Sequence, residues 1–227
     1  MLERVSSVIA NRQLGVQPAE VAEYKAARNW LRRCYRSQQE ATRADRSQLG
    51  WMKGHLEAFF HLGNVADWES AHRVVMVPNE TTGGQALHRL LFVWGYYEEQ
   101  KKIYEALLYQ VSPTVDLVCL SGLGSLHDVF GQYSKAISLH QQVLALAKAA
   151  ADVATQGSAL GALGNAYLSM GEHEKAIAHY QQHLAIAKES SHQASVGIAL
   201  GNLGNAYRIT EAYDLAYACL KERLEIA

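Results

Sequence analysis

One segment in the C-terminal half of the chain recurs three times at a constant spacing of 40 residues. The copies begin at Leu120, Leu160 and Leu200, and no insertion or deletion separates them. The aligned positions hold the same residue in every copy: Leu123, Leu163 and Leu203; Gly124, Gly164 and Gly204; Ala136, Ala176 and Ala216; Leu144, Leu184 and Leu224. Such a period predicts a stack of similar supersecondary units, because one unit cannot bury its apolar face alone.

Each copy has the pattern of two helices joined by a tight turn. In the second copy, apolar residues recur at helical spacing. The first stripe comprises Leu160, Leu163 and Tyr167, and the second comprises Ala176, Tyr180 and Leu184. Gly171 lies between them, where glycine tolerates a left-handed backbone, and Gly131 holds the same place in the first copy. We expect helices of about 17 residues, roughly 25 Å long, which approach each other closely at Gly164 and Ala176.

These copies resemble the tetratricopeptide repeat family. The matching positions are the Leu163-Gly164 pair, Tyr167, Gly171 and Ala176. The family's usual period is about 34 residues, and the 40-residue period is similar to the long-helix subclass of G-protein-signalling modulators and bacterial signalling arrays. The copies depart from the pattern at two places: His127 replaces the aromatic residue in the first, and Glu211 replaces the turn glycine in the third. The resemblance implies an all-α fold, a right-handed α-solenoid of antiparallel helix pairs.

The resemblance divides the chain into two regions. Residues 117–227 contain three units, at about 117–152, 153–192 and 193–227. Residues 1–116 show the pattern in degraded form, with turns expected at Gly95 and near Asp67, and a long helix expected from Pro18 to about Ala44. We interpret this first region as degenerate helical hairpins whose packing uses larger side chains, because all four tryptophans precede Gly95.

The resemblance also implies where a partner binds. In the family, polar residues on the concave face, formed by the first helices, hold a peptide through its backbone and acidic side chains. The corresponding candidates here are Asn165, Asn202, Asn205, Arg208, Ser125 and Asp128. An asparagine amide both donates and accepts, as a peptide backbone does, and asparagine is a poor helix former that needs a reason to recur. Plain exposure to solvent is the alternative, and it is favoured for Arg208, Ser125 and Asp128.

Two other patterns suggest binding sites of different kinds. Helix 25–36 aligns Arg28, Arg32 and Arg36 at four-residue spacing, which suits phosphate, nucleic acid or an acidic partner. Because the formal net charge is −1, a solvated face is the favoured reading there. His179 and His183 have a spacing compatible with a metal, but no third ligand accompanies them and the other copies lack the pair. We therefore predict no metal and no cofactor.

No motif for catalysis or for a membrane is present in the sequence. Neither a phosphate loop nor a dinucleotide fingerprint occurs, and no nucleophile, base and orienting group can be assembled from spacing. The three cysteines form no C-x-x-C pair, which fits a reducing, cytoplasmic setting. The sequence contains neither a signal peptide nor a run of apolar residues long enough to span a bilayer. We predict a cytoplasmic protein that is not an enzyme.

The favoured function is therefore a scaffold for protein–protein interaction. A regulatory or sensor arm of a larger enzyme or signalling protein is the alternative, and nucleic-acid binding through helix 25–36 is a weaker one. The sequence ends directly after a second-helix pattern, with no polar capping helix. We hypothesise that either the natural chain continues or this end pairs with a second copy.

Overall fold

The computed structural model describes residues 17–40, 48–78 and 84–226. Throughout these residues the regular secondary structure is helical, with no β-strand. The chain forms two compact units, Met1–Pro113 and Thr114–Ala227. None of the helices in the described ranges is both long and apolar enough to cross a membrane.

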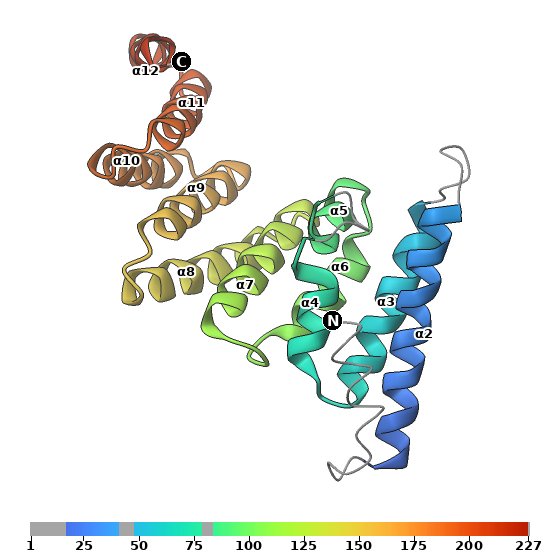
Figure 1. The fold of residues 1–227 in the computed structure, drawn as a ribbon. Coiled ribbons are helices and arrows are strands. Elements are labelled where there is room, and N and C mark those ends of the chain that lie inside the picture. Colours follow the sequence, from blue (N-terminus) through green and yellow to red (C-terminus); the bar gives the residue numbers. More distant parts are fainter. Residues whose placement is uncertain (1–16, 41–47, 79–83, 227) are drawn as a thin grey trace. The chain divides into compact units, whose positions relative to one another are not determined.

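Within the described residues, the first unit contains five helices of unequal length. They are labelled in Figure 1. They are α2 (Pro18–Glu40), α3 (Gln48–Asn64), α4 (Trp68–Met76), α5 (Leu87–Val93) and α6 (Tyr97–Leu107). Helix α3 packs against both α2 and α4, and α5 packs against α6. Pro18 begins α2, as expected of a residue without a backbone N–H in a first helical turn. The expected far end of this helix, Ala44, lies outside the described residues.

Both expected turns of the first unit are confirmed. Asp67 caps α4, because its carboxylate accepts a hydrogen bond of 3.1 Å from the backbone N–H of Ser70. Ala71 is fully buried, and the ring of half-buried Trp68 lies over Gly63, where an added Cβ would stand 3.1 Å from it. Gly95 joins α5 to α6 with a φ of +78°.

The second unit consists of three helical hairpins that repeat in sequence. Its helices are α7 (Pro113–Val129), α8 (Tyr133–Ala149), α9 (Val153–Ser169), α10 (His173–Glu189), α11 (Gln193–Ile209) and α12 (Tyr213–Glu225). The first five have 17 residues each, which confirms the expected length, and α12 has 13. In each hairpin we call α7, α9 and α11 the first helices and α8, α10 and α12 the second helices. The hairpins stack because α9 packs against α8 and α10, and α11 packs against α10 and α12.

The turns within the hairpins follow the expected chemistry. Gly131 and Gly171 have φ values of +69° and +77°, in the left-handed region that glycine enters without steric cost. Glu211 adopts the same conformation in the third hairpin, with φ of +59°. The third hairpin therefore keeps the turn geometry despite its substitution, at a steric cost to the glutamate backbone.

The core between hairpins is formed by the predicted apolar stripes. Ala176 and Tyr180 of α10 pack with Leu203 and Ala206 of α11, and all four are almost fully buried. A second cluster joins α10 to α11 through Ala187, Val196 and Leu200. Burial of these side chains between neighbouring hairpins makes each hairpin depend on the next for its stability.

Candidate functional site

One glycine of each first helix, at the aligned position of Gly124, Gly164 and Gly204, faces a side chain of its own second helix. A Cβ added at Gly164 would overlap the ring of Tyr180, and one at Gly124 would overlap the imidazole of His140. The close approach expected at Gly164 is thus filled by an aromatic ring from α10. The Tyr180 hydroxyl donates a hydrogen bond of 2.7 Å to Asn165 Oδ1, and burial raises the pKa of Tyr180 to about 12. The Tyr180 hydroxyl of α10 therefore holds the Asn165 side chain of α9 in one orientation at the surface.

The outer side of each first helix presents the same pattern of exposed positions. We define the first-helix stripe as positions 118, 122, 125 and 129 of α7 and the positions 40 and 80 residues further on, in α9 and α11. This spacing keeps the four positions of a helix on one face. In all three helices the second position is half-buried and the other three are exposed. Helices α9 and α11 also contact each other.

The three predicted asparagines all belong to this stripe. Asn165 and Asn205 are exposed at its third position, and Asn202 is half-buried at its second. Arg208 is exposed and lies beside the stripe, where its guanidinium donates a hydrogen bond of 3.1 Å to Asn205 Oδ1. Three of the six predicted residues thus lie on α11, and Asn165 lies at the corresponding position of α9.

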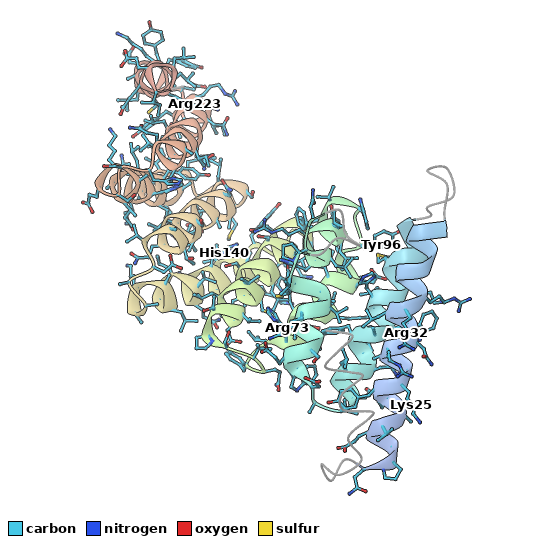
Figure 2. The ribbon with its side chains drawn as sticks, in the orientation of Figure 1. Lys25, Arg32, Arg73, Tyr96, His140 and Arg223 are labelled. Atoms are coloured by element: carbon cyan, nitrogen blue, oxygen red, sulfur yellow. The ribbon has the colours of Figure 1, made fainter. Side chains whose placement is uncertain are left out.

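The two predicted residues of α7 have local partners. The Ser125 hydroxyl is exposed and donates a hydrogen bond of 3.1 Å to the backbone carbonyl of Ser121. Asp128 is half-buried, and its Oδ2 lies 3.1 Å from Nε2 of His140, a buried residue of α8 labelled in Figure 2. Ser125 belongs to the stripe, whereas the Asp128 carboxylate is engaged inside its own hairpin.

The stripe contains no charged residue, and four of its positions expose large apolar side chains. Val118, Val129, Ile198 and Ile209 have exposed fractions of 40%, 47%, 59% and 40%. Serine, asparagine, glycine or alanine occupies the remaining positions. The absence of charge at these positions could have been found in the repeat alignment, in which positions 118, 158 and 198 correspond. A search for polar anchor residues overlooks it.

Charge is distributed unequally between the two kinds of helix in the second unit. The first helices carry only Asp116, Asp128 and Arg208 among Asp, Glu, Lys and Arg. The second helices carry Lys135, Lys148, Glu174, Lys175, Lys188, Glu189, Asp214, Lys221, Glu222, Arg223 and Glu225. One of these residues is Arg223 of α12, which is labelled in Figure 2. A Cβ added at Gly201 of α11 would stand 3.0 Å from its Nη1. The second helices therefore hold most of the charged surface.

The histidine pair of α10 is divided between two environments. The ring of His179 stacks on Tyr167 with centroids 5.3 Å apart. His183 is buried against Gly157 and Gly161, and its Nε2 lies 2.8 Å from the Ser195 hydroxyl. Burial lowers the pKa of both histidines. Across the described ranges no group of three or more His, Cys, Asp and Glu side chains could hold a metal ion.

The basic residues of α2 do not form a uniform exposed row. Arg32 is exposed, as is Lys25, and both are labelled in Figure 2. Arg28 is half-buried, and Arg33 places its guanidinium 5.7 Å from the Trp30 ring centroid. The side chain of Arg36 lies outside the described residues. The aligned arginine row proposed from the sequence is therefore interrupted at Arg28.

The two cysteines whose side chains are described resemble packing residues. Cys119 is fully buried, and burial, followed by the nearby Asp116 charge, raises its pKa to about 12. Burial also raises the pKa of half-buried Cys219. Both thiols therefore stay protonated at neutral pH and are weak nucleophiles. The side chain of Cys34 lies outside the described residues.

Stacked helical hairpins with an exposed stripe on every first helix define a helical-repeat protein. Residues 155–227 and 119–154 match two models that are each described as tetratricopeptide repeat. Residues 119–227 therefore contain tetratricopeptide repeats. Neither model names a catalytic activity, and no protein of curated function matches the chain in sequence.

Solved structures share this fold at low sequence identity. The chain is similar to BtubC (BKLC) from P. vanneervenii, with a TM-score of 0.57 and 15% identity over 93% of this chain and 91% of that one. The apo form of RapI has a TM-score of 0.68 and 13% identity over 88% and 70%. MamA from Desulfovibrio magneticus RS-1 has a TM-score of 0.58 and 17% identity over 88% and 94%. Together with the helical hairpins, these likenesses confirm the predicted all-α solenoid.

Proposed function

We propose that this protein is a non-catalytic scaffold that holds a segment of a partner protein on its first-helix stripe. Asn165, Asn202 and Asn205 are the hydrogen-bonding anchors in this proposal. Each amide N–H group can donate to a backbone carbonyl of the partner, whereas Oδ1 of Asn165 and Oδ1 of Asn205 already accept from Tyr180 and Arg208. The exposed valines and isoleucines beside them supply the apolar contact.

One observation carries the proposal: in three successive first helices the same three stripe positions are exposed and the fourth is half-buried. The exposed positions lie on the helix surface, although Asn165 also accepts the hydrogen bond of the buried Tyr180 hydroxyl. Asn165 is moreover fixed by the Tyr180 hydroxyl, which occupies its Oδ1 and leaves the amide N–H groups directed elsewhere. A side chain held in one orientation loses less conformational entropy when it binds a partner.

The test uses peptides selected from a phage-displayed random library on the purified full chain. The variant combines Asn165→Ala, Asn202→Ala and Asn205→Ala. We expect its affinity for the selected peptides to fall by at least about tenfold, equivalent to about 1.4 kcal/mol. Circular dichroism and thermal unfolding would verify that the variant is folded.

A matched control removes three exposed amides from the second helices instead. It combines Gln141→Ala, Gln142→Ala and Gln182→Ala, all exposed on α8 or α10. We expect the control to bind the peptides with an affinity within about twofold of that of the unaltered chain. Surface side chains outside an interface contribute little to the free energy of binding. Full binding by the folded asparagine variant would refute the placement of the anchors.

A further inference from the structure

The exposed surface of the first helices has an unusual chemistry, because no position of the stripe is charged in α7, α9 or α11. We propose that the partner segment it takes is itself uncharged, with apolar and amide side chains at its contact positions. The proposal rests on the function proposed above and specifies the chemistry of the partner. It differs from the acidic peptide that the family resemblance implies.

Removing water from a charged group costs free energy unless an opposite charge or hydrogen bonds replace the water. Ile198 and Ile209 lie at the two ends of the α11 stripe, with exposed fractions of 59% and 40%. A carboxylate or ammonium group seated against them would lose its hydration and gain no opposite charge in return. An apolar side chain in the same place gains from burial, and a backbone or amide group can pair with Asn165 or Asn205.

The charged residues of the three first helices lie outside the stripe positions. Asp128 is turned toward His140 within its own hairpin, at 3.1 Å. Asp116 lies two residues before Val118, which places it on the opposite side of α7. Arg208 reaches the stripe, but its guanidinium is bonded to Asn205. No position of the stripe is therefore charged, and the one charged group that reaches it is the Arg208 guanidinium at its edge.

The fold itself does not require a neutral stripe. When the α5–α6 hairpin is aligned with the α9–α10 hairpin on their turn glycines, Gly95 and Gly171, the exposed residue Arg89 takes the place of Asn165. The same position of a first helix therefore accommodates a charge. Since packing permits charge there, its absence from three consecutive first helices is better explained by what the stripe contacts.

The test places either sign of charge on the stripe and measures affinity for the selected library peptides. Ser158→Glu and Ser158→Arg alter an exposed stripe position of α9, and Ser138→Glu and Ser138→Arg alter an exposed position of α8 as controls. We expect both Ser158 variants to bind at least about tenfold more weakly and both controls to bind within about twofold.

Two further readouts identify the chemistry of the peptides. The selected pool should be depleted in Asp, Glu, Lys and Arg relative to the unselected library. Its affinity should change less than about twofold between about 50 and about 200 mM NaCl, since screening acts only on charged contacts.

The outcomes separate this inference from the proposed function. If Ser158→Arg strengthens binding while Ser158→Glu weakens it, or if the peptides are acidic and salt-sensitive, the stripe binds a charged partner. The inference then fails while the proposed function stands. If the Ser138 controls weaken binding as much as the Ser158 variants, or if no peptide is enriched, both fail.

Discussion

The hairpins α5–α6 and α9–α10 have the same turn, yet they fill the space between their helices in different ways. In α9–α10, Gly164 and Ala176 leave room for the Tyr180 ring. The equivalent positions of α5–α6 hold His88, Gln100 and Tyr104, and all three are buried. Hairpin α9–α10 thus packs an aromatic ring against glycine and alanine. Hairpin α5–α6 instead packs three larger polar side chains against one another.

The polar arrangement in α5–α6 is held by hydrogen bonds. The His88 Nδ1 atom lies 2.9 Å from the Tyr104 hydroxyl, and Gln100 Nε2 donates to that hydroxyl at 2.9 Å and to the His88 carbonyl at 2.7 Å. Buried polar groups are tolerated when they are paired, and of this group only Gln100 Oε1 is buried without a hydrogen-bond partner. The comparison shows that the hairpin geometry permits either solution, and that the polar one makes stability depend on protonation.

The largest expected effect concerns His88 and acid. Burial, and then the charges of Arg89 and His72, lower its pKa from 6.5 to about 4. Because the unfolded state binds this proton more readily, protonation favours unfolding. The contribution of neutral His88 to the free energy of unfolding is therefore complete above pH 6.5 and is lost as pH falls toward 4. We expect the free energy of unfolding of the first unit to decrease by about 3 kcal/mol over this range.

Urea unfolding at a series of pH values would measure this loss. The His88→Gln variant provides the control, since it removes the titrating group and should flatten the dependence between pH 6.5 and 4. A wild-type profile with the same slope as that of the variant would show that His88 is not held neutral by its hairpin.

The steric solution in α9–α10 predicts the next largest effect. Gly164→Ala places a methyl group within the ring of Tyr180, and we expect a loss of about 2 kcal/mol from overpacking. Gly204→Ala is the matched change, since its Cβ would stand 3.4 Å from Leu220 Cγ, an ordinary contact. Alanine is the better helix former, so this control should gain up to about 1 kcal/mol.

Thermal unfolding of the two variants would distinguish packing from helix propensity. Equal responses at Gly164 and Gly204 would contradict the role assigned to the Tyr180 ring. The Gly164→Ala penalty should also shrink in a Tyr180→Leu background, which reproduces the pairing of Gly204 with Leu220.

A smaller effect is expected at the turns that all hairpins share. Glu211→Gly should raise the free energy of unfolding by about 1 kcal/mol, because glycine adopts a φ of +59° without the clash that other residues suffer. Gly171→Ala should lower it by a similar amount. Differential scanning calorimetry of both would check the turn argument, and a destabilised Glu211→Gly protein would indicate that the glutamate side chain makes a compensating contact.

The smallest effect belongs to the exposed faces. Ser158→Glu and Ser138→Glu should each change the free energy of unfolding by less than about 0.5 kcal/mol, since both positions are exposed helix surface. Chemical denaturation would measure both. A large loss from Ser158→Glu alone would mean that the stripe is neutral for reasons of stability rather than of binding.

The repeats allowed much of the second unit to be predicted from sequence. A fixed spacing places leucines, glycines and turns in register, so the helix lengths and the turns at Gly131 and Gly171 follow from periodicity. The first unit was harder, because His88 and Gln100 occupy positions where the later hairpins have glycine and alanine. Periodicity cannot reveal that such polar residues are buried, since their burial depends on partners in another helix.

The candidate site was only partly accessible to the same reasoning. Polarity and the family resemblance drew attention to Asn165, Asn202 and Asn205, and the structure places them on one stripe. They also drew attention to Asp128, whose half-buried carboxylate faces His140 across the hairpin. No local signal distinguishes that carboxylate from a solvated one, because its partner lies 12 residues away on α8.

The most direct test asks which helices the bound peptide touches. The photoreactive residue p-benzoylphenylalanine would replace Ser158 on α9 in one protein and Ser138 on α8 in another, both at exposed positions. With a selected peptide bound, irradiation should yield a cross-link from position 158 and none above background from position 138. Cross-linking from position 138 alone, or equally from both, would contradict a partner site on the first helices.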